Sequence, residues 1–205
     1  MLIRKVDAYK NDLSRVIVYF EDKSYITVSV ERARELNLKA GDEVDATLMQ
    51  ELSDSSRESA AKACAARIIG RSSMSCATLL KKLRDKGIDE ISAQAALDWL
   101  CGLGIMDDTA YAKTLVAHYR TRGFGNRRIL EEMRKRGITR EVADTVLDDC
   151  DMNEEITEYI LKKIRGAELD DKLKARITNA LLRRGHSYDE IKRAFNRTEN
   201  GGNGF

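Results

Sequence analysis

Two adjacent carboxylates, Asp107 and Asp108, are the pair of side chains whose spacing most suggests chemistry in this sequence. A divalent cation would need further oxygen ligands at a defined spacing, and the neighbouring sequence supplies none. Acid–base catalysis would need a second titratable group held across a pocket. The pair instead precedes an amphipathic segment, where an aspartate accepts hydrogen bonds from free backbone N–H groups and stabilises the helix start by about 1 kcal/mol. The sequence therefore predicts that Asp107 and Asp108 cap a helix.

A glycine-rich loop, residues 123–128 with the sequence GFGNRR, is the next candidate because such loops can bind phosphate groups. It lacks the third glycine and the preceding strand of a dinucleotide-binding site. We interpret it as a link between two helices, with Asn126 as the N-cap of the second helix.

Cysteine and histidine residues are too scattered to predict a metal site or a catalytic site. The cysteines form no Cys-x-x-Cys pair, and only His118 and His186 could join them as ligands. We therefore predict reduced, mostly buried thiols, no metal, no cofactor and no catalytic residue. His186 follows a repeated glycine, so a partly buried position in a turn is expected for it. The cysteines are Cys64, Cys76, Cys101 and Cys150.

The sequence contains a threefold internal repeat centred on a glycine. In each copy, apolar residues stand eight and four positions before the glycine and six and ten positions after it. A spacing of four places apolar residues on one face of a helix, and the glycine sets the turn between two helices. The copies are residues 79–97, 129–147 and 177–195, and their glycines are Gly87, Gly137 and Gly185.

A further amphipathic segment precedes each copy, so each repeat is expected to contain three helices. One such unit buries little apolar surface by itself, and neighbouring units should therefore stack into an array. The chain has no proline, which favours a mostly helical protein because proline breaks helix interiors. Repeat arrays bind partners along a concave surface more often than they catalyse reactions.

The amino-terminal residues are expected to form a small β unit. Residues 15–20 are β-branched and aromatic, residues 25–30 alternate, and residues 2–9 could add a third strand before a short helix over 31–37. The predicted fold class is mostly α, with three tandem three-helix repeats in a curved, solenoid-like array preceded by a small N-terminal β-hairpin extension. The predicted domains are the β-rich extension with its short helix (1–52), the three repeats (53–104, 105–150 and 151–198) and a disordered tail (199–205).

Charge is distributed unevenly along the chain, although the formal net charge is only +2. Residues 57–140 carry 17 basic and 9 acidic side chains, a net of +8, whereas the segments on either side each carry a net of −3. Such a basic block favours an anionic partner, such as nucleic acid or an acidic protein groove. No apolar run approaches the roughly 18 residues of a membrane span, and no signal peptide is evident. We therefore expect a cytoplasmic protein that does not bind a membrane.

Residues 104–138 carry a pattern that resembles the signature of the RecX family of recombinase regulators. The pattern consists of an apolar step, the Asp-Asp pair, an aromatic-alanine pair, a basic helix end, a Gly-x-x-Arg-Ile loop and a helix ending in Lys/Arg-Gly-Ile. The residues that match the two short motifs are Tyr111 and Ala112, and Gly125, Arg128 and Ile129.

The first repeat resembles the same family. Arg71 and Ser75 are similar to the family's arginine and helix-capping serine before a Leu-x-x-x-Leu helix. Two positions depart from the pattern: Met74 stands where family members usually have a basic residue, and Thr78 replaces the glutamate of the capping box, which weakens that helix start.

The resemblance implies a non-enzymatic regulator. RecX-like proteins dock in the groove of the RecA–DNA filament and restrain its growth or promote its disassembly. They thereby inhibit recombinase, ATPase and coprotease activity in DNA repair and the SOS response. The implied partners are the RecA filament and single- and double-stranded DNA, bound without sequence specificity by a monomer.

The expected contact residues are the basic side chains that lie off the apolar helix faces. They are Lys81, Lys82, Arg84 and Lys86 in the first repeat, Arg120, Arg122, Arg127, Arg128, Arg134, Lys135 and Arg136 in the second, and Arg183 and Arg184 in the third. The expected helix-capping residues are Ser75, Asp107, Asp108 and Asn126.

Two other functions stay open from the sequence. A DNA-binding protein of helix-turn-helix type would share the glycine turn and the basic second helix, but residues 79–86 and 129–136 lack the Asn, Gln and Ser side chains expected to recognise base edges. Sequence-selective binding to duplex DNA without a recombinase would favour this alternative. A repeat scaffold for some other acidic protein would have no effect on the recombinase.

Overall fold

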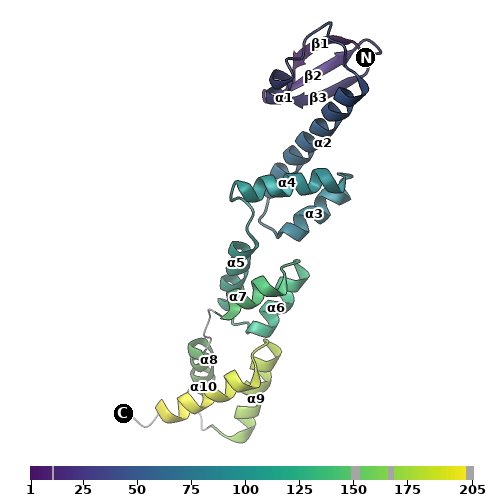
Figure 1. Ribbon diagram of the computed structural model, residues 1–205. Helices are drawn as coiled ribbons and strands as arrows, with labels where there is room; N and C mark the ends of the chain where they lie inside the picture. Colours follow the sequence, from purple (N-terminus) through teal and green to yellow (C-terminus); the bar gives the residue numbers. More distant parts are fainter. Residues whose placement is uncertain (11, 149–152, 166–168, 202–205) are drawn as a thin grey trace. The chain divides into compact units, whose positions relative to one another are not determined.

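The structure is a computed structural model that describes residues 1–10, 12–148, 153–165 and 169–201. Within these residues it contains three strands followed by ten helices (Figure 1), which confirms the predicted mostly α fold class. The chain divides into two compact units. One consists of Met1–Ser73 and Thr78–Met106, and the other consists of Met74–Ala77 and the residues from Asp107 onward.

The first unit begins with a three-stranded antiparallel sheet, ordered as in the sequence. Its strands are β1 (Ile3–Ala8), β2 (Arg15–Phe20) and β3 (Tyr25–Ser29), so the possible third strand over residues 2–9 is present. The alternating pattern of β2 and β3 buries Val18 and Val28 completely, because side chains two residues apart share one face of a sheet.

Strand β3 ends one residue earlier than predicted, since Val30 begins the short helix α1 (Val30–Glu35). Ser29 caps this helix: its hydroxyl accepts a hydrogen bond from the backbone N–H of Arg32. An N-cap residue has extended backbone, and the residue after it is already helical. Ser29 is therefore the last residue of β3.

Helix α2 (Ala46–Ile69) connects the sheet to the first repeat, and the boundary predicted between residues 52 and 53 falls inside it. Leu52, in the first half of α2, is buried in the same core as Phe20 and Val28 of the sheet. Ala61 and Ala65, in the second half, are also buried, and α2 packs against both β3 and α4 (Glu90–Gly102). One helix thus contributes to two cores, and the predicted boundary lies within this continuous helix.

The first repeat consists of α2, α3 (Cys76–Asp85) and α4. Leu79 and Leu83 of α3 are completely buried, as the spacing of four predicts. Asp89 caps α4, because its carboxylate accepts a hydrogen bond from the backbone N–H of Ser92 at 2.9 Å.

The second unit contains the two further three-helix repeats (Figure 1). Each of them has its own apolar core. The second repeat buries Leu115, Ile129 and Met133 among its helices, and the third buries Ile160 and Leu181. The helices are α5 (Asp108–Arg120), α6 (Asn126–Lys135) and α7 (Arg140–Asp148), followed by α8 (Asn153–Ile164), α9 (Asp171–Arg183) and α10 (Tyr188–Gly201).

A glycine in left-handed backbone conformation joins the last two helices of every repeat. The φ angle is +79° at Gly87, +73° at Gly137 and +90° at Gly185. Side chains rarely tolerate this conformation, which ends a helix and satisfies its last carbonyl groups. The glycines that align in the sequence are therefore the turns of the structure.

Two hydrogen-bonded joints within the second unit follow one pattern. In each, the residue before the middle helix of one repeat donates a hydrogen bond to the residue before the glycine turn of the following repeat. The Ser75 hydroxyl donates to the carbonyl oxygen of Arg136, directly before one glycine turn. Gly125 stands at the equivalent position and donates its N–H to the carbonyl oxygen of Arg184 at 3.0 Å. Each joint satisfies a carbonyl group at a helix end, which has no partner within its own helix.

Gly125 has no room for a side chain. A Cβ atom there would lie 2.5 Å from the carbonyl group of Gly185 and from the backbone nitrogen of His186. A Cβ atom on Gly185 would in turn lie 2.5 Å from the backbone nitrogen of Arg128. The joint therefore requires glycine on both sides, because two backbones pack directly against each other.

Two further predictions differ from the structure. Cys64 and Cys76 are half-buried and Cys101 is exposed, so the prediction of mostly buried thiols is wrong for these three; Cys150 lies outside the described residues. Helix α10 continues to Gly201. The tail predicted from residue 199 therefore starts inside a helix, and residues 202–205 lie outside the described residues.

Candidate functional site

The basic residues of α6 and its C-cap residue Arg136 divide into a paired group and an unpaired group. The paired group comprises Arg128, Lys135 and Arg136, whose side-chain nitrogens lie 3.4, 2.9 and 2.9 Å from the carboxylate of Glu132. A separation of three or four residues places all of them beside Glu132 on the helix surface. The Glu132 side chain is only 12% exposed, and hydrogen bonds from Lys135 and Arg136 lower its pKa to about 2.

Tyr119 of α5 joins this group of charges. Its hydroxyl donates to the Glu132 carboxylate at 3.2 Å and accepts from Arg136 at 3.3 Å. The Arg136 guanidinium also lies 5.8 Å from the centre of the Tyr119 ring. The group, called the Glu132 cluster below, therefore ties α6 to α5; its members are Tyr119, Arg128, Glu132, Lys135 and Arg136.

The Glu132 cluster gives three predicted contact residues a structural role that the sequence analysis did not assign. Opposite charges three and four residues apart are a sequence signal that could have identified the pairing with Glu132. Tyr119 lies on a different helix, and no local signal connects it to the cluster.

Arg127 and Arg134 are the unpaired cations of α6. Both are exposed, and neither forms an ion pair with a carboxylate in the part of the chain that the structure describes. Seven residues make almost two full helical turns, so the two side chains lie on nearly the same side of α6. Their charges are available to an anionic partner.

The part of α3 that belongs to the first unit carries a second group of unpaired cations. Lys81, Lys82 and Arg84 in the helix and Lys86 directly after it are exposed, and within the described ranges no carboxylate forms an ion pair with them. The name free cations is used below for Lys81, Lys82, Arg84, Lys86, Arg127 and Arg134.

The remaining predicted contact residues lie near the third repeat. Arg183 is exposed, whereas Arg120, Arg122 and Arg184 line a cavity of about 390 Å³ in the second unit. Arg120 carries two buried nitrogens, Nε and Nη2, that have no hydrogen-bond partner among the described residues. The Arg184 guanidinium lies 4.8 Å from the centre of the Tyr159 ring. The sequence predicted these arginines as contact residues but gave no sign of the cavity.

The two adjacent aspartates, Asp107 and Asp108, have different roles. Asp107 is the N-cap of α5, where its carboxylate accepts hydrogen bonds from the backbone N–H groups of Thr109 and Ala110 at 2.7 and 3.1 Å. Asp108 accepts instead from the backbone N–H of Cys76, the first residue of α3, at 2.8 Å. The prediction that Asp108 caps its own helix is therefore wrong, because its carboxylate serves the start of a helix far away in the sequence.

The predicted cap at Asn126 is also wrong. Gly125 occupies the N-cap of α6 in extended conformation and offers no side-chain hydrogen bond. The close approach to Gly185 requires glycine at that position, and the helix therefore starts one residue earlier than predicted. The Oδ1 atom of Asn126 is buried, with no hydrogen-bond partner among the described residues. Ser75 is completely buried directly before α3, where it forms the joint with Arg136.

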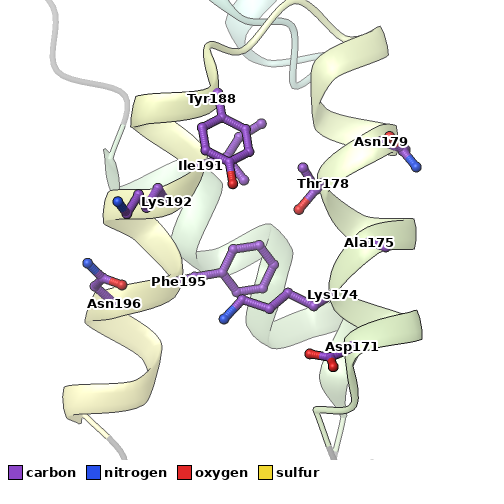
Figure 2. A pocket seen from close by; sticks show the side chains of 10 residues that line it. All are labelled: Asp171, Lys174, Ala175, Thr178, Asn179, Tyr188, Ile191, Lys192, Phe195 and Asn196. Carbon is purple, nitrogen blue, oxygen red and sulfur yellow. The ribbon is translucent and has the colours of Figure 1, made fainter.

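A second cavity of about 410 Å³ lies between α9 and α10 (Figure 2). Figure 2 shows the Phe195 ring projecting toward α9, with Lys174 lying against it and Tyr188 at the other end of the cavity. The Lys174 Nζ atom is 5.2 Å from the centre of the Phe195 ring. Among the described residues, none that lines this cavity has a buried polar atom without a partner, so no buried group there requires a ligand.

In the described parts of the chain, no group of three or more His, Cys, Asp or Glu side chains could hold a metal ion. None of the helices in these parts is long and apolar enough to cross a membrane. The described residues contain two features that could bind a partner. They are the exposed positive charges of the free cations and the arginine-lined cavity.

A small sheet followed by three-helix repeats, each turned by a left-handed glycine, defines a class of helical-repeat protein. The family model of the second three-helix domain of RecX matches residues 107–147, and that of the third three-helix domain matches residues 151–195. The chain belongs to the RecX family.

Related sequences cover most of the chain. "Regulatory protein RecX" of Clostridioides difficile (strain 630) is 27% identical over 205 residues, which cover 97% of this chain and 96% of that protein. "Regulatory protein RecX" of Trichlorobacter lovleyi (strain ATCC BAA-1151 / DSM 17278 / SZ) is 32% identical over 139 residues, which cover 64% of this chain and 90% of that protein.

Solved structures share the fold. A crystal structure of regulatory protein RecX has a TM-score of 0.73 at 22% identity and covers 93% of this chain and 98% of its own. A crystal structure of RecX from Lactobacillus salivarius has a TM-score of 0.65 at 21% identity and covers 70% of this chain and 97% of its own.

Proposed function

We propose that this chain is a non-enzymatic, cytoplasmic regulator that binds the RecA–DNA filament through its free cations. Binding inhibits the recombinase, ATPase and coprotease activities of RecA. The observation that carries the proposal is the set of exposed lysines and arginines on α3 and α6 that no carboxylate of the described residues neutralises. Family membership supports it, since the relatives are named regulatory proteins.

The free cations have the chemistry that a filament groove of DNA phosphate and acidic protein surface would bind. Each lysine or arginine that neutralises a phosphate releases a counterion, so affinity falls as salt rises, with a slope of about 0.7 per contact on single-stranded DNA. Contacts to the backbone carry no sequence information. Two contacts from Arg127 and Arg134 would therefore contribute a slope of about 1.4.

The Glu132 cluster supports the same proposal indirectly. Its hydrogen bonds hold α6 against α5, so Arg127 and Arg134 project from a helix whose orientation within the second unit is fixed. Side chains on a rigid helix lose less freedom on binding than side chains on a loop, which favours affinity.

The steady-state ATPase activity of RecA on single-stranded DNA, titrated with this chain at about 50 and about 200 mM salt, tests the proposal. We expect inhibition that becomes weaker at the higher salt concentration. Inhibition at ratios well below one chain per RecA would favour capping or disassembly over coating of the groove. No inhibition by a chain that still binds naked DNA would contradict the proposal and favour the helix-turn-helix alternative.

A further inference from the structure

The cavity that Arg120, Arg122 and Arg184 line is formed by the end of α5 and the residues after it, by α8, and by the turn between α9 and α10. Its volume of about 390 Å³ lies in the range of small-molecule sites. Four cationic side chains line it, the fourth being Lys162, against two carboxylates from α8. The excess of positive charge favours an anionic ligand.

Arg120 indicates what kind of anion fits. Its Nε and Nη2 atoms form one edge of the guanidinium group, and both are buried without a hydrogen-bond partner among the described residues. A buried N–H group without an acceptor is costly, and native proteins rarely leave one. Two oxygens of a phosphoryl or carboxyl group accept from such an edge at the same time. An oxyanion would therefore satisfy both nitrogens.

His186 also lines this cavity, and its ring carries a further unpaired atom. Its side chain is 4% exposed, and its Nε2 atom lies 3.2 Å from the carbonyl oxygen of Gly123. A carbonyl oxygen only accepts, so Nε2 carries the proton and Nδ1 is an acceptor. Nδ1 is buried without a partner in the described part of the chain. Because burial lowers the pKa of His186, the ring is neutral near pH 7. Nδ1 can then accept a hydrogen bond from a hydroxyl or amino group.

Arg184 is held beside the cavity by the Tyr159 ring and by Gly123. A Cβ atom on Gly123 would lie 2.8 Å from the Nη1 atom of Arg184, so the missing side chain leaves room for the guanidinium group. The φ angle of Gly123 is +72°, a conformation that also favours glycine. The loop thus keeps a second guanidinium group at the cavity wall.

We infer that this cavity binds a single nucleotide unit, with phosphoryl oxygens accepting hydrogen bonds from Arg120 and Arg184 and a sugar hydroxyl or base amino group donating to Nδ1 of His186. A nucleoside without phosphate would leave Arg120 unsatisfied, whereas a nucleotide matches both unpaired groups. The nucleotide is either one unit of a single strand or a free nucleotide. The inference goes beyond the proposed function and does not require RecA.

The test is an NMR titration of the ¹⁵N-labelled full chain, at constant ionic strength, with deoxyadenosine 5′-monophosphate and, separately, with a deoxyadenosine trinucleotide, because adenine carries the amino donor in both. We expect saturable shifts of the Arg120 Nε–H, of the Gly123 amide and of the His186 ring. Deoxyadenosine should bind at least about tenfold more weakly, because it lacks the oxyanion. Tighter binding of the trinucleotide assigns the site to a strand, and tighter binding of the monophosphate assigns it to a free nucleotide; both support the inference.

Substitutions of Arg120 show whether the edge formed by its Nε and Nη2 atoms binds the nucleotide. Arg120→Gln should weaken nucleotide binding at least about tenfold, and Arg120→Lys, which keeps the charge but loses the paired edge, should weaken it as well. Arg176→Gln removes one exposed charge of α9 away from the cavity and should leave binding unchanged.

Two results would overturn the inference: no saturable shift with either nucleotide, or equal binding by the wild-type chain and both Arg120 variants. Its failure is distinguishable from failure of the proposed function. A wild-type chain that binds nucleotide but does not inhibit RecA would refute only the function, and a chain that inhibits RecA without binding nucleotide would refute only the inference.

Discussion

Replacement of Glu132 by glutamine tests whether the Glu132 cluster stabilises the second repeat. The glutamine side chain has nearly the same shape, so Glu132→Gln removes the charge with little change in packing. It leaves Arg128, Lys135 and Arg136 close together without the carboxylate that they now surround. We expect the variant to fold but to open locally more often at α5 and α6.

The magnitude follows from the pKa of Glu132, which hydrogen bonds from Lys135 and Arg136 lower from its ordinary value of 4.5 to about 2. At about 1.4 kcal/mol for each pH unit, this difference corresponds to an upper limit of about 3 kcal/mol. The partner side chains are 35–58% exposed, so solvent screens the interaction. We therefore expect a loss of about 1–2 kcal/mol.

The contribution of Glu132 to the stability of the folded state depends on pH with a defined sign. Because the pKa of Glu132 is lower in the folded state than in the unfolded state, its stabilisation is complete above about pH 5.5 and is lost as the pH falls toward about 2. Near pH 3, roughly two fifths should remain. Hydrogen exchange of the α5 and α6 amides, measured for wild type and Glu132→Gln near pH 7 and near pH 3, gives both free energies of opening.

Glu131→Gln is the matched control. Glu131 lies next to Glu132 in α6, but it is 46% exposed and its nearest cationic atom, in Arg128, is 3.4 Å away. Its replacement should cost less than about 0.5 kcal/mol. The reasoning is refuted if both variants lose the same free energy, or if the difference between wild type and Glu132→Gln does not shrink at low pH.

Three further predictions concern the joint at Gly125, the helix cap at Asp107 and the buried ring of His186. Gly125→Ala should destabilise the second unit by about 1–3 kcal/mol in thermal unfolding, since its Cβ would meet the backbone of the next repeat, whereas Gly102→Ala, with no atom within 4 Å of its Cβ, should be neutral or slightly stabilising. Asp107→Ala should cost about 1 kcal/mol and speed hydrogen exchange in the first turn of α5, because two cap hydrogen bonds are lost; unchanged exchange would contradict this role. Burial lowers the pKa of His186, so the stability that its neutral ring contributes is complete above about pH 6.5 and lost below it. The melting temperature of His186→Gln should therefore fall less with decreasing pH than that of the wild-type chain. An equal fall in both would refute the lowered pKa of His186 as a cause of the pH dependence.

Features set by residues close together in the sequence were predictable. The aligned glycines Gly87, Gly137 and Gly185 are the left-handed turns, since a spacing of four in the flanking apolar residues is a local property of helices. Asp107 caps the helix that follows it for the same reason. The fold class, the three repeats and the third strand follow from such local patterns.

Features set by contacts between distant segments were not predictable from local pattern. Asp108 accepts from Cys76, and Gly125 packs on Gly185; neither contact leaves a signal within one helix. Helix α2 shows the same limit, because a helix that serves two cores has the periodicity of one helix and hides the boundary between them.

The candidate site was predictable by residue type but not by role. All the free cations are among the basic residues named from the sequence, and so are the arginines that line the cavity. Their different roles depend on Glu132, which pairs with two cations of α6 and with its C-cap residue Arg136. They also depend on buried atoms such as Nε of Arg120, whose lack of a partner among the described residues only the packed structure reveals.

Charge reversal of the free cations of α6 tests the central claim that they bind the filament. Arg127→Glu with Arg134→Glu should raise the concentration that half-inhibits RecA ATPase at least about tenfold and reduce its salt dependence, with unchanged helical circular dichroism. Arg193→Glu with Arg197→Glu makes the same charge change on exposed positions of α10 and should alter that concentration by less than about twofold. Equal inhibition by the wild-type chain and both double variants, or equal loss in both variants, would contradict the claim.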